Sequence, residues 1–191
     1  MEDRLSTALR APAYHHRGLL AGLPLLFALF CTWHEYSNLI VTWTVGGIVF
    51  AIGVAIRLWA QQNLHFRLPM EEDLTTSGPY AFVRNPIYIG NIIISISLNI
   101  MSGILWLLPI TLITGCVVYS VAVRYEEGYL LGRYGEPYAA YMKRIPRWIP
   151  RLSGAKFSWT TDYLGASLKA EAHNLLFIIP LIAKDVIQTV A

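Results

Sequence analysis

The sequence is poor in charge and in cysteine, and it lacks the glycine-rich loops of soluble nucleotide-binding folds. Only 14% of its 191 residues are charged and 55% are hydrophobic, a balance that points toward the bilayer. Its two cysteines, Cys31 and Cys116, lie in separate apolar segments and predict neither a disulfide framework nor a CxxC site. No GxGxxG or phosphate loop occurs, which excludes the soluble dinucleotide-binding folds.

Metal binding and nucleic-acid binding are not indicated either. The five histidines are His15, His16, His34, His65 and His173; they lack ligand spacing and cysteine partners, so we expect no metal site. The net charge is only +3, and the basic residues follow the ends of apolar segments without any recognition module. We therefore expect no nucleic-acid partner.

Long uncharged runs are the dominant feature of the sequence. They contain 17 residues between Arg17 and Glu35, 21 between Glu35 and Arg57, and 39 between Arg84 and Arg124. A spanning helix needs roughly 20 apolar residues, so the longest run predicts a tight helical hairpin over about 86–123 that turns near 99–103. The fold class predicted is therefore all-α, a polytopic integral membrane bundle within a single domain, 1–191.

A fifth span depends on the residues after Glu171. Only 12 residues separate Glu171 from Lys184, and Pro180 interrupts them. A Lys184 side chain that snorkels to the interface would lengthen the apolar stretch toward Val190. We accordingly predict four to five transmembrane helices.

The basic residues predict the orientation. With four spans, 14 of the 15 lysines and arginines fall on one side, which the positive-inside rule makes cytoplasmic. We expect the N-terminus on that side, together with the polar motifs and a cofactor pocket. A bacterial inner membrane and an endoplasmic-reticulum membrane are both compatible with this pattern.

The third span begins at a clear local signal, Asn85-Pro86. Asparagine is a strong helix N-cap and proline suits the first helical position, so we predict a helix from Pro86 with Tyr88 in its first turn. Arg84 then lies at the membrane surface. Tyr134, Tyr138 and Tyr141 recur at i, i+4 and i+7, which predicts one face of a helix continuing outside the membrane.

Several motifs occur here in a fairly specific order. They are GPYAFVRNPIYIG, the pair Glu126-Glu127, Tyr134-Gly135, the two further tyrosines and RIPRWIP. Together, over about residues 74–150, they resemble the isoprenylcysteine carboxyl methyltransferase and phospholipid methyltransferase group of membrane enzymes. The resemblance marks 74–151 as a catalytic core between N-terminal helices (1–73) and a C-terminal interfacial segment (152–191). Many family members carry histidine where this chain has Asn85, so no ionisable role is carried over to that position.

The resemblance implies S-adenosyl-L-methionine as cofactor and a hydrophobic or lipidated acceptor, with a prenylcysteine-type carboxylate as first choice. Carboxylates, an arginine and aromatic faces suit the charged groups of this donor. The catalytic candidates are Glu127, Arg144 and Arg147. The cofactor-binding candidates are Arg84, Asn85, Pro86, Tyr88, Glu126, Tyr138 and Tyr141.

Other interpretations of the same residues stay open at this point. The acidic pair could be a solvated helix end, Arg84 a surface anchor, and the tyrosines a packed stripe. An NADPH-dependent sterol or steroid reductase has a similar architecture, and a non-enzymatic membrane scaffold would use the polar clusters only for topology. The acceptor and the oligomeric state are not indicated by the sequence.

Overall fold

The computed structural model describes residues 14–33, 35–64, 74–152, 157–159 and 163–190. Within these ranges every regular element is helical, with seven α-helices and two short 3₁₀ helices. The helices are α2 (Arg17–Phe30), α3 (Leu39–Leu64), η1 (Gly78–Ala81), α4 (Pro86–Met101), η2 (Leu105–Leu107), α5 (Leu108–Tyr134), α6 (Glu136–Arg144), α7 (Leu164–Leu175) and α8 (Ile178–Val190). The all-α class is thus confirmed for the part of the chain that is described.

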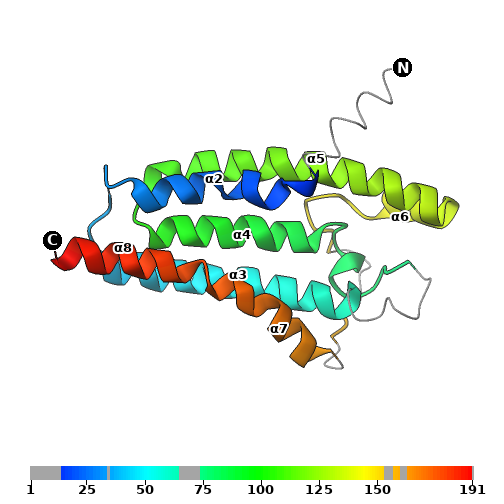
Figure 1. Cartoon of the computed structure of the whole chain (residues 1–191). Coiled ribbons are helices and arrows are strands. Elements are labelled where there is room, and N and C mark those ends of the chain that lie inside the picture. The colour runs from blue at the N-terminus through cyan, green and yellow to red at the C-terminus, as the bar shows by residue number, and fades with distance from the viewer. Residues whose placement is uncertain (1–13, 34, 65–73, 153–156, 160–162, 191) are drawn as a thin grey trace, which may run out of the picture.

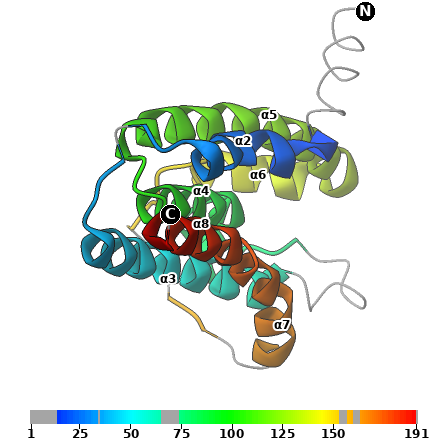
Figure 2. The same ribbon diagram turned by 60° about the vertical axis from the view of Figure 1, so that its left-hand side comes forward.

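Helix α4 occupies the middle of the bundle (Figures 1 and 2). It packs between α3 on one side and α5 on the other, with α2 alongside α5 and α8 alongside α3. Helix α4 starts at Pro86 as predicted. The hairpin from α4 to α5 turns at Gly103, whose φ of 75° favours glycine, so the predicted hairpin is confirmed.

The contact between α3 and α4 depends on two facing glycines. A Cβ atom on Gly53 would lie 3.2 Å from the carbonyl oxygen of Gly90, and one on Gly90 would lie 3.0 Å from that of Gly53. Small residues of this kind let membrane helices approach closely.

The distribution of polar and apolar side chains is inverted relative to a water-soluble protein. Large apolar side chains face outward on α2, α3, α5 and α8, with Phe30 87% exposed and Ile40 81% exposed. The buried polar side chains are Thr42, Arg57, Gln61, Gln62, Asn63, Ser97, Asn99, Ser102, Thr111, Glu127, Ser167, Glu171, Asn174 and Lys184. Apolar exposure on this scale indicates a membrane or partner surface, and it supports a membrane protein.

Two helices, α3 and α5, are long and apolar enough to cross a membrane. Helix α2 has 14 residues and α4 has 16, which corresponds to about 21 and 24 Å at 1.5 Å per residue. These lengths are below the roughly 30 Å of a hydrocarbon core. The count of four to five spans is therefore not confirmed by helix length.

Three local expectations were wrong. The first uncharged run, between Arg17 and Glu35, is helical only from Arg17 to Phe30, and the C-terminal segment forms two short helices, α7 and α8, instead of one. Lys184 does not snorkel: its side chain is buried, and its Nζ donates to the carbonyl oxygens of Ala28 and Ser102 and pairs with Glu35 at 3.1 Å. These acceptors are available because α8 lies across the ends of α2 and α4.

Candidate active site

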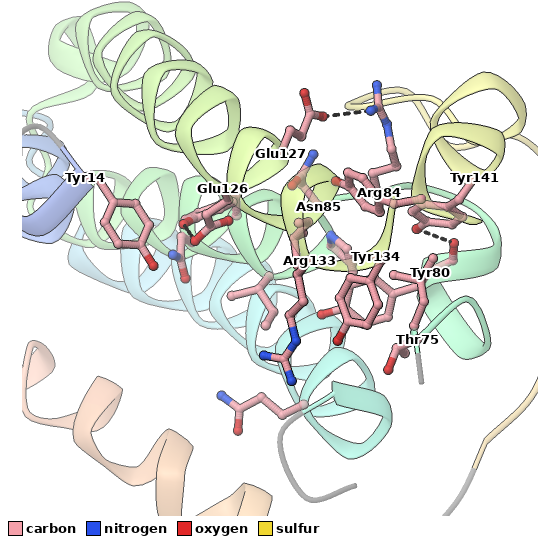
Figure 3. A pocket seen from close by; sticks show the side chains of 18 of the residues that line it. Tyr14, Thr75, Tyr80, Arg84, Asn85, Glu126, Glu127, Arg133, Tyr134 and Tyr141 are labelled. Carbon is pink, nitrogen blue, oxygen red and sulfur yellow. Dashed lines mark hydrogen bonds and ion pairs between the residues drawn. The ribbon is translucent and has the colours of Figure 1, made fainter. Parts of the chain in front are cut away.

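A cavity of about 490 Å³ opens where several helix ends meet. The start of α2, the ends of α3 and α5, the start of α4 and helix α6 all contribute to it, and Figure 3 shows it from close by. Its lining residues are Tyr14, Arg17, Arg57, Gln61, Leu74, Thr75, Tyr80, Arg84, Asn85, Pro86, Ile87, Tyr88, Asn91, Glu126, Glu127, Leu130, Arg133, Tyr134, Tyr138 and Tyr141.

The segment before α4 is tied to the chain after α6. Asn85 occupies the N-cap position but makes no capping hydrogen bond; its amide instead donates to the carbonyl of Arg147 at 3.1 Å. The expected side-chain cap is thus wrong: the Asn85 side chain is oriented by donating to Arg147, and its oxygen accepts no hydrogen bond from the first turn of α4. The backbone N–H of Arg84 also donates to the carbonyl of Pro146 at 2.9 Å. These bonds bring the side chains of Arg84 and Arg147 within reach of the same carboxylate.

That carboxylate is Glu127, which is buried at the end of α5. Arg84 Nη1 lies 2.8 Å from Glu127 Oε1, and Arg147 donates through Nε to Oε1 at 3.0 Å and through Nη2 to Oε2 at 2.5 Å. The pKa of Arg147 is raised by this hydrogen bonding to Glu127. Both oxygens of Glu127 are therefore engaged, and the carboxylate links α4, α5 and the segment after α6.

Glu126 has a different environment, although it is the neighbouring residue. It accepts a hydrogen bond from the Tyr88 hydroxyl at 2.7 Å and forms no ion pair with any residue in the described ranges. Burial, followed by the Glu126 charge, raises the pKa of Tyr14. Glu126 thus presents an uncompensated negative charge to the cavity, bounded by phenol groups.

Arg84, which also lines the cavity, has a hydrogen-bond donor without a partner. Its side chain is 12% exposed, and its Nε atom is buried without a hydrogen-bond partner. A buried donor of this kind is expensive to leave unpaired. The cavity is therefore lined by a carboxylate without an ion-pair partner among the described residues and by an arginine whose buried Nε has no hydrogen-bond partner.

The tyrosines line another part of the cavity, but they do not belong to one continuous helix as expected. Helix α5 ends at Tyr134, Gly135 adopts φ 59°, and α6 carries Tyr138 and Tyr141. The glycine breaks the helix because its backbone takes a positive φ that other residues adopt rarely. The Tyr141 hydroxyl donates to the Tyr80 carbonyl at 2.9 Å.

Burial, followed by the charge of Glu127, raises the pKa of Tyr138 to about 12. Burial also raises the pKa of Tyr141. Both phenols are therefore neutral at physiological pH. They offer aromatic faces and hydroxyl groups to whatever fills the cavity.

A second buried ion pair borders the cavity and was missed from the sequence. Arg57 donates to Glu171 through Nε at 2.8 Å and Nη2 at 2.9 Å, and its Nη1 reaches the side chain of Asn91. Gln61 and Asn174 donate amide hydrogens to the same carboxylate. In the sequence Arg57 appears only as the end of an uncharged run, and the apolar residues around it, which continue as a helix to Leu64, were the available signal.

The structure brings most of the candidate residues together. Eight of them line the cavity, namely Arg84, Asn85, Pro86, Tyr88, Glu126, Glu127, Tyr138 and Tyr141. Arg147 contacts the cavity wall through Glu127, whereas Arg144 is not among the lining residues. Tyr14, Arg17, Gln61 and Arg133 were not anticipated, and only their aromatic or polar character near helix ends could have suggested them.

No group of three or more histidine, cysteine, aspartate or glutamate side chains that could hold a metal ion occurs within the described ranges. The charged groups at the cavity are instead arranged as carboxylate–guanidinium contacts. Such contacts suit an organic ligand that carries both signs of charge.

Comparison with known proteins links this chain to one family. The model of the phospholipid methyltransferase family matches residues 39–137, just over half of the chain. The chain is 34% identical over 80 residues to a protein-S-isoprenylcysteine O-methyltransferase of Schizosaccharomyces pombe, covering 40% of this chain and 33% of that protein. It is 30% identical over 127 residues to the enzyme of the same name from Xenopus laevis, covering 61% of this chain and 44% of that protein.

Another relative is named as a metal-resistance protein and not as a methyltransferase. The cobalt-zinc-cadmium resistance protein CzcN of Cupriavidus metallidurans is 27% identical over 147 residues, covering 69% of this chain and 67% of that protein. The chain thus spans two thirds of CzcN and less than half of the two methyltransferases. No solved structure matches the chain significantly. The matches support a membrane methyltransferase.

Proposed function

This chain belongs to the phospholipid methyltransferase family, and from that premise we propose that it is an integral membrane methyltransferase that uses S-adenosyl-L-methionine. The family match confirms the resemblance seen in the motifs at 74–150. The acceptor we propose is hydrophobic or lipid-like, with a prenylcysteine-type carboxylate as first candidate. The observation that carries this proposal is that one cavity is lined both by Glu126, which forms no ion pair with the described residues, and by Arg84, whose Nε has no hydrogen-bond partner.

The cavity residues fit the donor chemically. S-adenosylmethionine has an ammonium group, a carboxylate, a sulfonium and two ring systems. Glu126 would hold a positive group, Arg84 would donate its free Nε–H to the carboxylate, and the tyrosines of α6 would provide aromatic faces. A volume of about 490 Å³ lies in the usual range of roughly 300–1,000 Å³ for small-molecule sites.

The bound donor would supply a methyl group on a positively charged sulfur, open to in-line attack by a nucleophile. The task of this chain is then to align the two reactants and exclude water. A carboxylate acceptor is already deprotonated, so neither glutamate has to remove a proton. As the methyl group moves to oxygen, the positive charge on sulfur and the negative charge on the acceptor carboxylate disappear together, so Glu126 would act by binding and orienting the positively charged donor before transfer.

Glu127 and Arg147 receive a positioning role in this proposal. Both oxygens of Glu127 are bonded to guanidinium groups, so the carboxylate is held rather than free to react. Its effect is to orient Arg84 toward the cavity. Arg144 lies outside the lining set, and its catalytic role stays a prediction.

The surroundings of the cavity agree with a lipid-like acceptor. Helices α2, α3 and α5 carry exposed apolar side chains, and each has one end at the cavity, so an acceptor could reach it from the hydrocarbon. We propose that this end of the bundle is cytoplasmic, as the basic residues predict. We propose further that α2 and α4 cross the membrane together with α3 and α5, with 1–191 forming one methyltransferase domain around the core at 74–151.

Binding of S-adenosylhomocysteine to the detergent-purified protein tests the donor site. Glu126→Gln should weaken binding about ten-fold or more, because a charge-assisted hydrogen bond contributes about 1.5–3 kcal/mol. Glu136→Gln is the matched control, since Glu136 is an exposed carboxylate on α6 outside the cavity. Equal affinity of Glu126→Gln and wild type would contradict the proposed donor site. NADPH is the comparator, because tight NADPH binding without S-adenosylhomocysteine binding would favour a reductase.

Methyl transfer itself is tested with methyl-labelled S-adenosylmethionine and a membrane lipid extract. We expect label in the organic phase with wild type and little with Glu126→Gln. Mild alkali converts a methyl ester to methanol, so volatile label after base treatment would identify a carboxylate acceptor. Label that resists base would point to nitrogen or sulfur, and no label in any fraction would count against the enzyme class.

A further inference from the structure

Two arginines line the cavity without a carboxylate partner among the described residues, and they lie in different parts of it. Arg57 and Arg84 are paired with Glu171 and Glu127. Arg17 and Arg133 form no such pair. An unpaired guanidinium in a binding cavity is a ready site for a carboxylate or phosphate group of a ligand.

Arg133 belongs to the outer end of the cavity. It lies seven residues beyond Glu126 on α5, about 10 Å further along the helix axis, and its side chain is exposed beside the ring of Tyr134. Figure 3 shows Arg133 and Tyr134 together, apart from Tyr14. Arg133 is therefore placed to meet a ligand that arrives from the aqueous phase.

Arg17 occupies the opposite side, at the first turn of α2. Its Nη1 donates to the Tyr14 carbonyl at 2.7 Å, and its Cζ lies 4.1 Å from the centre of the Tyr14 ring. The guanidinium is thus held in one orientation while its other N–H groups make no hydrogen bond within the described ranges. Tyr14 also approaches Glu126, so Arg17 lies close to the group assigned to the reacting centre.

The outward face of α2 is hydrocarbon-like. Leu19 is 60% exposed and Leu23 is 50% exposed, and at 100° per residue both lie on the far side of the helix from Arg17. Arg17 itself lines the cavity at the first turn, where this apolar face begins. An amphiphile whose tail lies against the outward face of α2 would reach Arg17 with its polar head around this first turn.

We propose that Arg17 is a specificity-determining residue that binds the anionic head group of the membrane-embedded acceptor. This inference rests on the proposed function and adds that the acceptor is an anionic amphiphile, recognised separately from the donor. The anionic group is a carboxylate or a phosphate, since a guanidinium binds both through paired N–H groups. Arg133 at the outer end is not required for acceptor binding.

The test compares binding of three probes to detergent-purified protein saturated with S-adenosylhomocysteine. They are a farnesyl thioether with a carboxylate, the same compound with a carboxamide, and dioleoyl phosphatidic acid. Wild type should bind one or both of the anionic probes at least about ten-fold more tightly than the carboxamide, a difference of about 1.4 kcal/mol. Arg17→Gln should remove that preference, and Arg17→Lys should restore part of it.

The controls separate this proposal from the donor site. Arg133→Gln, the matched loss of an unpaired cavity arginine, should keep the preference for anionic probes. S-adenosylhomocysteine affinity should change less than two-fold in Arg17→Gln, so a failed donor site and a failed acceptor site give different results. Carboxylate-only preference would indicate a lipidated acid, and phosphatidic acid preference a phospholipid. The proposal is overturned if wild type shows no preference for anionic probes, or if Arg17→Gln retains it.

Discussion

The buried pair of Arg57 and Glu171 should dominate the response of this protein to single substitutions. The side chains are 10% and 3% exposed, and two hydrogen bonds of 2.8 and 2.9 Å join them. Glu171→Ala leaves a guanidinium buried without a counter-ion. Removing one partner of a buried pair typically costs about 3–5 kcal/mol, a large part of a total stability of about 5–15 kcal/mol.

The loss of stability should be larger because the buried face of helix α7 is polar. Ser167, Glu171 and Asn174 are the buried positions of α7, whereas Leu168 and Leu175 are exposed. The helix is therefore held to α3 mainly by the bonds that Glu171 makes. Loss of this carboxylate should release α7 as well as destabilise Arg57.

Thermal unfolding in detergent at a fixed scan rate measures the effect. For a chain of this size 1 kcal/mol corresponds to about 2–4 °C, so Glu171→Ala should lower Tm by about 6–20 °C. Glu171→Gln, which keeps the shape but not the charge, should fall between Ala and wild type. A double variant, Arg57→Met with Glu171→Leu, should recover most of the loss, since buried pairs can be replaced by apolar residues at little cost.

The reasoning is refuted by either of two results. One is a Glu171→Ala variant within about 1 kcal/mol of wild type, which would mean that water or lipid compensates the charge, as at exposed ion pairs. The other is a double variant as unstable as the sum of the single variants, which would mean that the two residues do not act as a pair.

Two further predictions concern the opposite end of the bundle and the alkaline range. Lys184→Met removes a buried ammonium held by three oxygens; it should lower Tm while S-adenosylhomocysteine affinity, measured by titration, stays unchanged, and an altered affinity at unchanged Tm would contradict this. The pKa of Tyr138 is raised from 10.0 to about 12, so folding favours the neutral phenol and its contribution is complete below pH 10. That contribution should disappear between pH 10 and about 12 in wild type but not in Tyr138→Phe, as followed by unfolding at each pH, and parallel curves for both proteins would refute it.

Much of the scaffold follows from local patterns in the chain. Asn85-Pro86 predicts the start of α4 because proline has no N–H to lose at the first helical position. The uncharged run of 39 residues predicts the hairpin because one bilayer crossing needs about half that length. Both depend on properties of neighbouring residues, which a sequence displays directly.

The helix break at Gly135 could be predicted only in part from such local patterns. The i, i+4, i+7 spacing of Tyr134, Tyr138 and Tyr141 is helical, yet the glycine takes a positive φ and starts a new helix. Spacing alone does not report the backbone dihedral angle. The glycine between the tyrosines and the proline that follows two residues later were the available signals.

The sequence by itself determined that this is an apolar helical protein with a methyltransferase motif set and an acidic pair at the end of its fourth apolar segment. Only the tertiary structure decided which member of that pair is free. Successive residues of an α-helix point about 100° apart, so Glu127 turns toward Arg84 and Arg147 while Glu126 turns toward the cavity. The pairing of Arg57 with Glu171, 114 residues away, was likewise decided by packing, because no local pattern relates two charges whose helices meet only in the folded bundle.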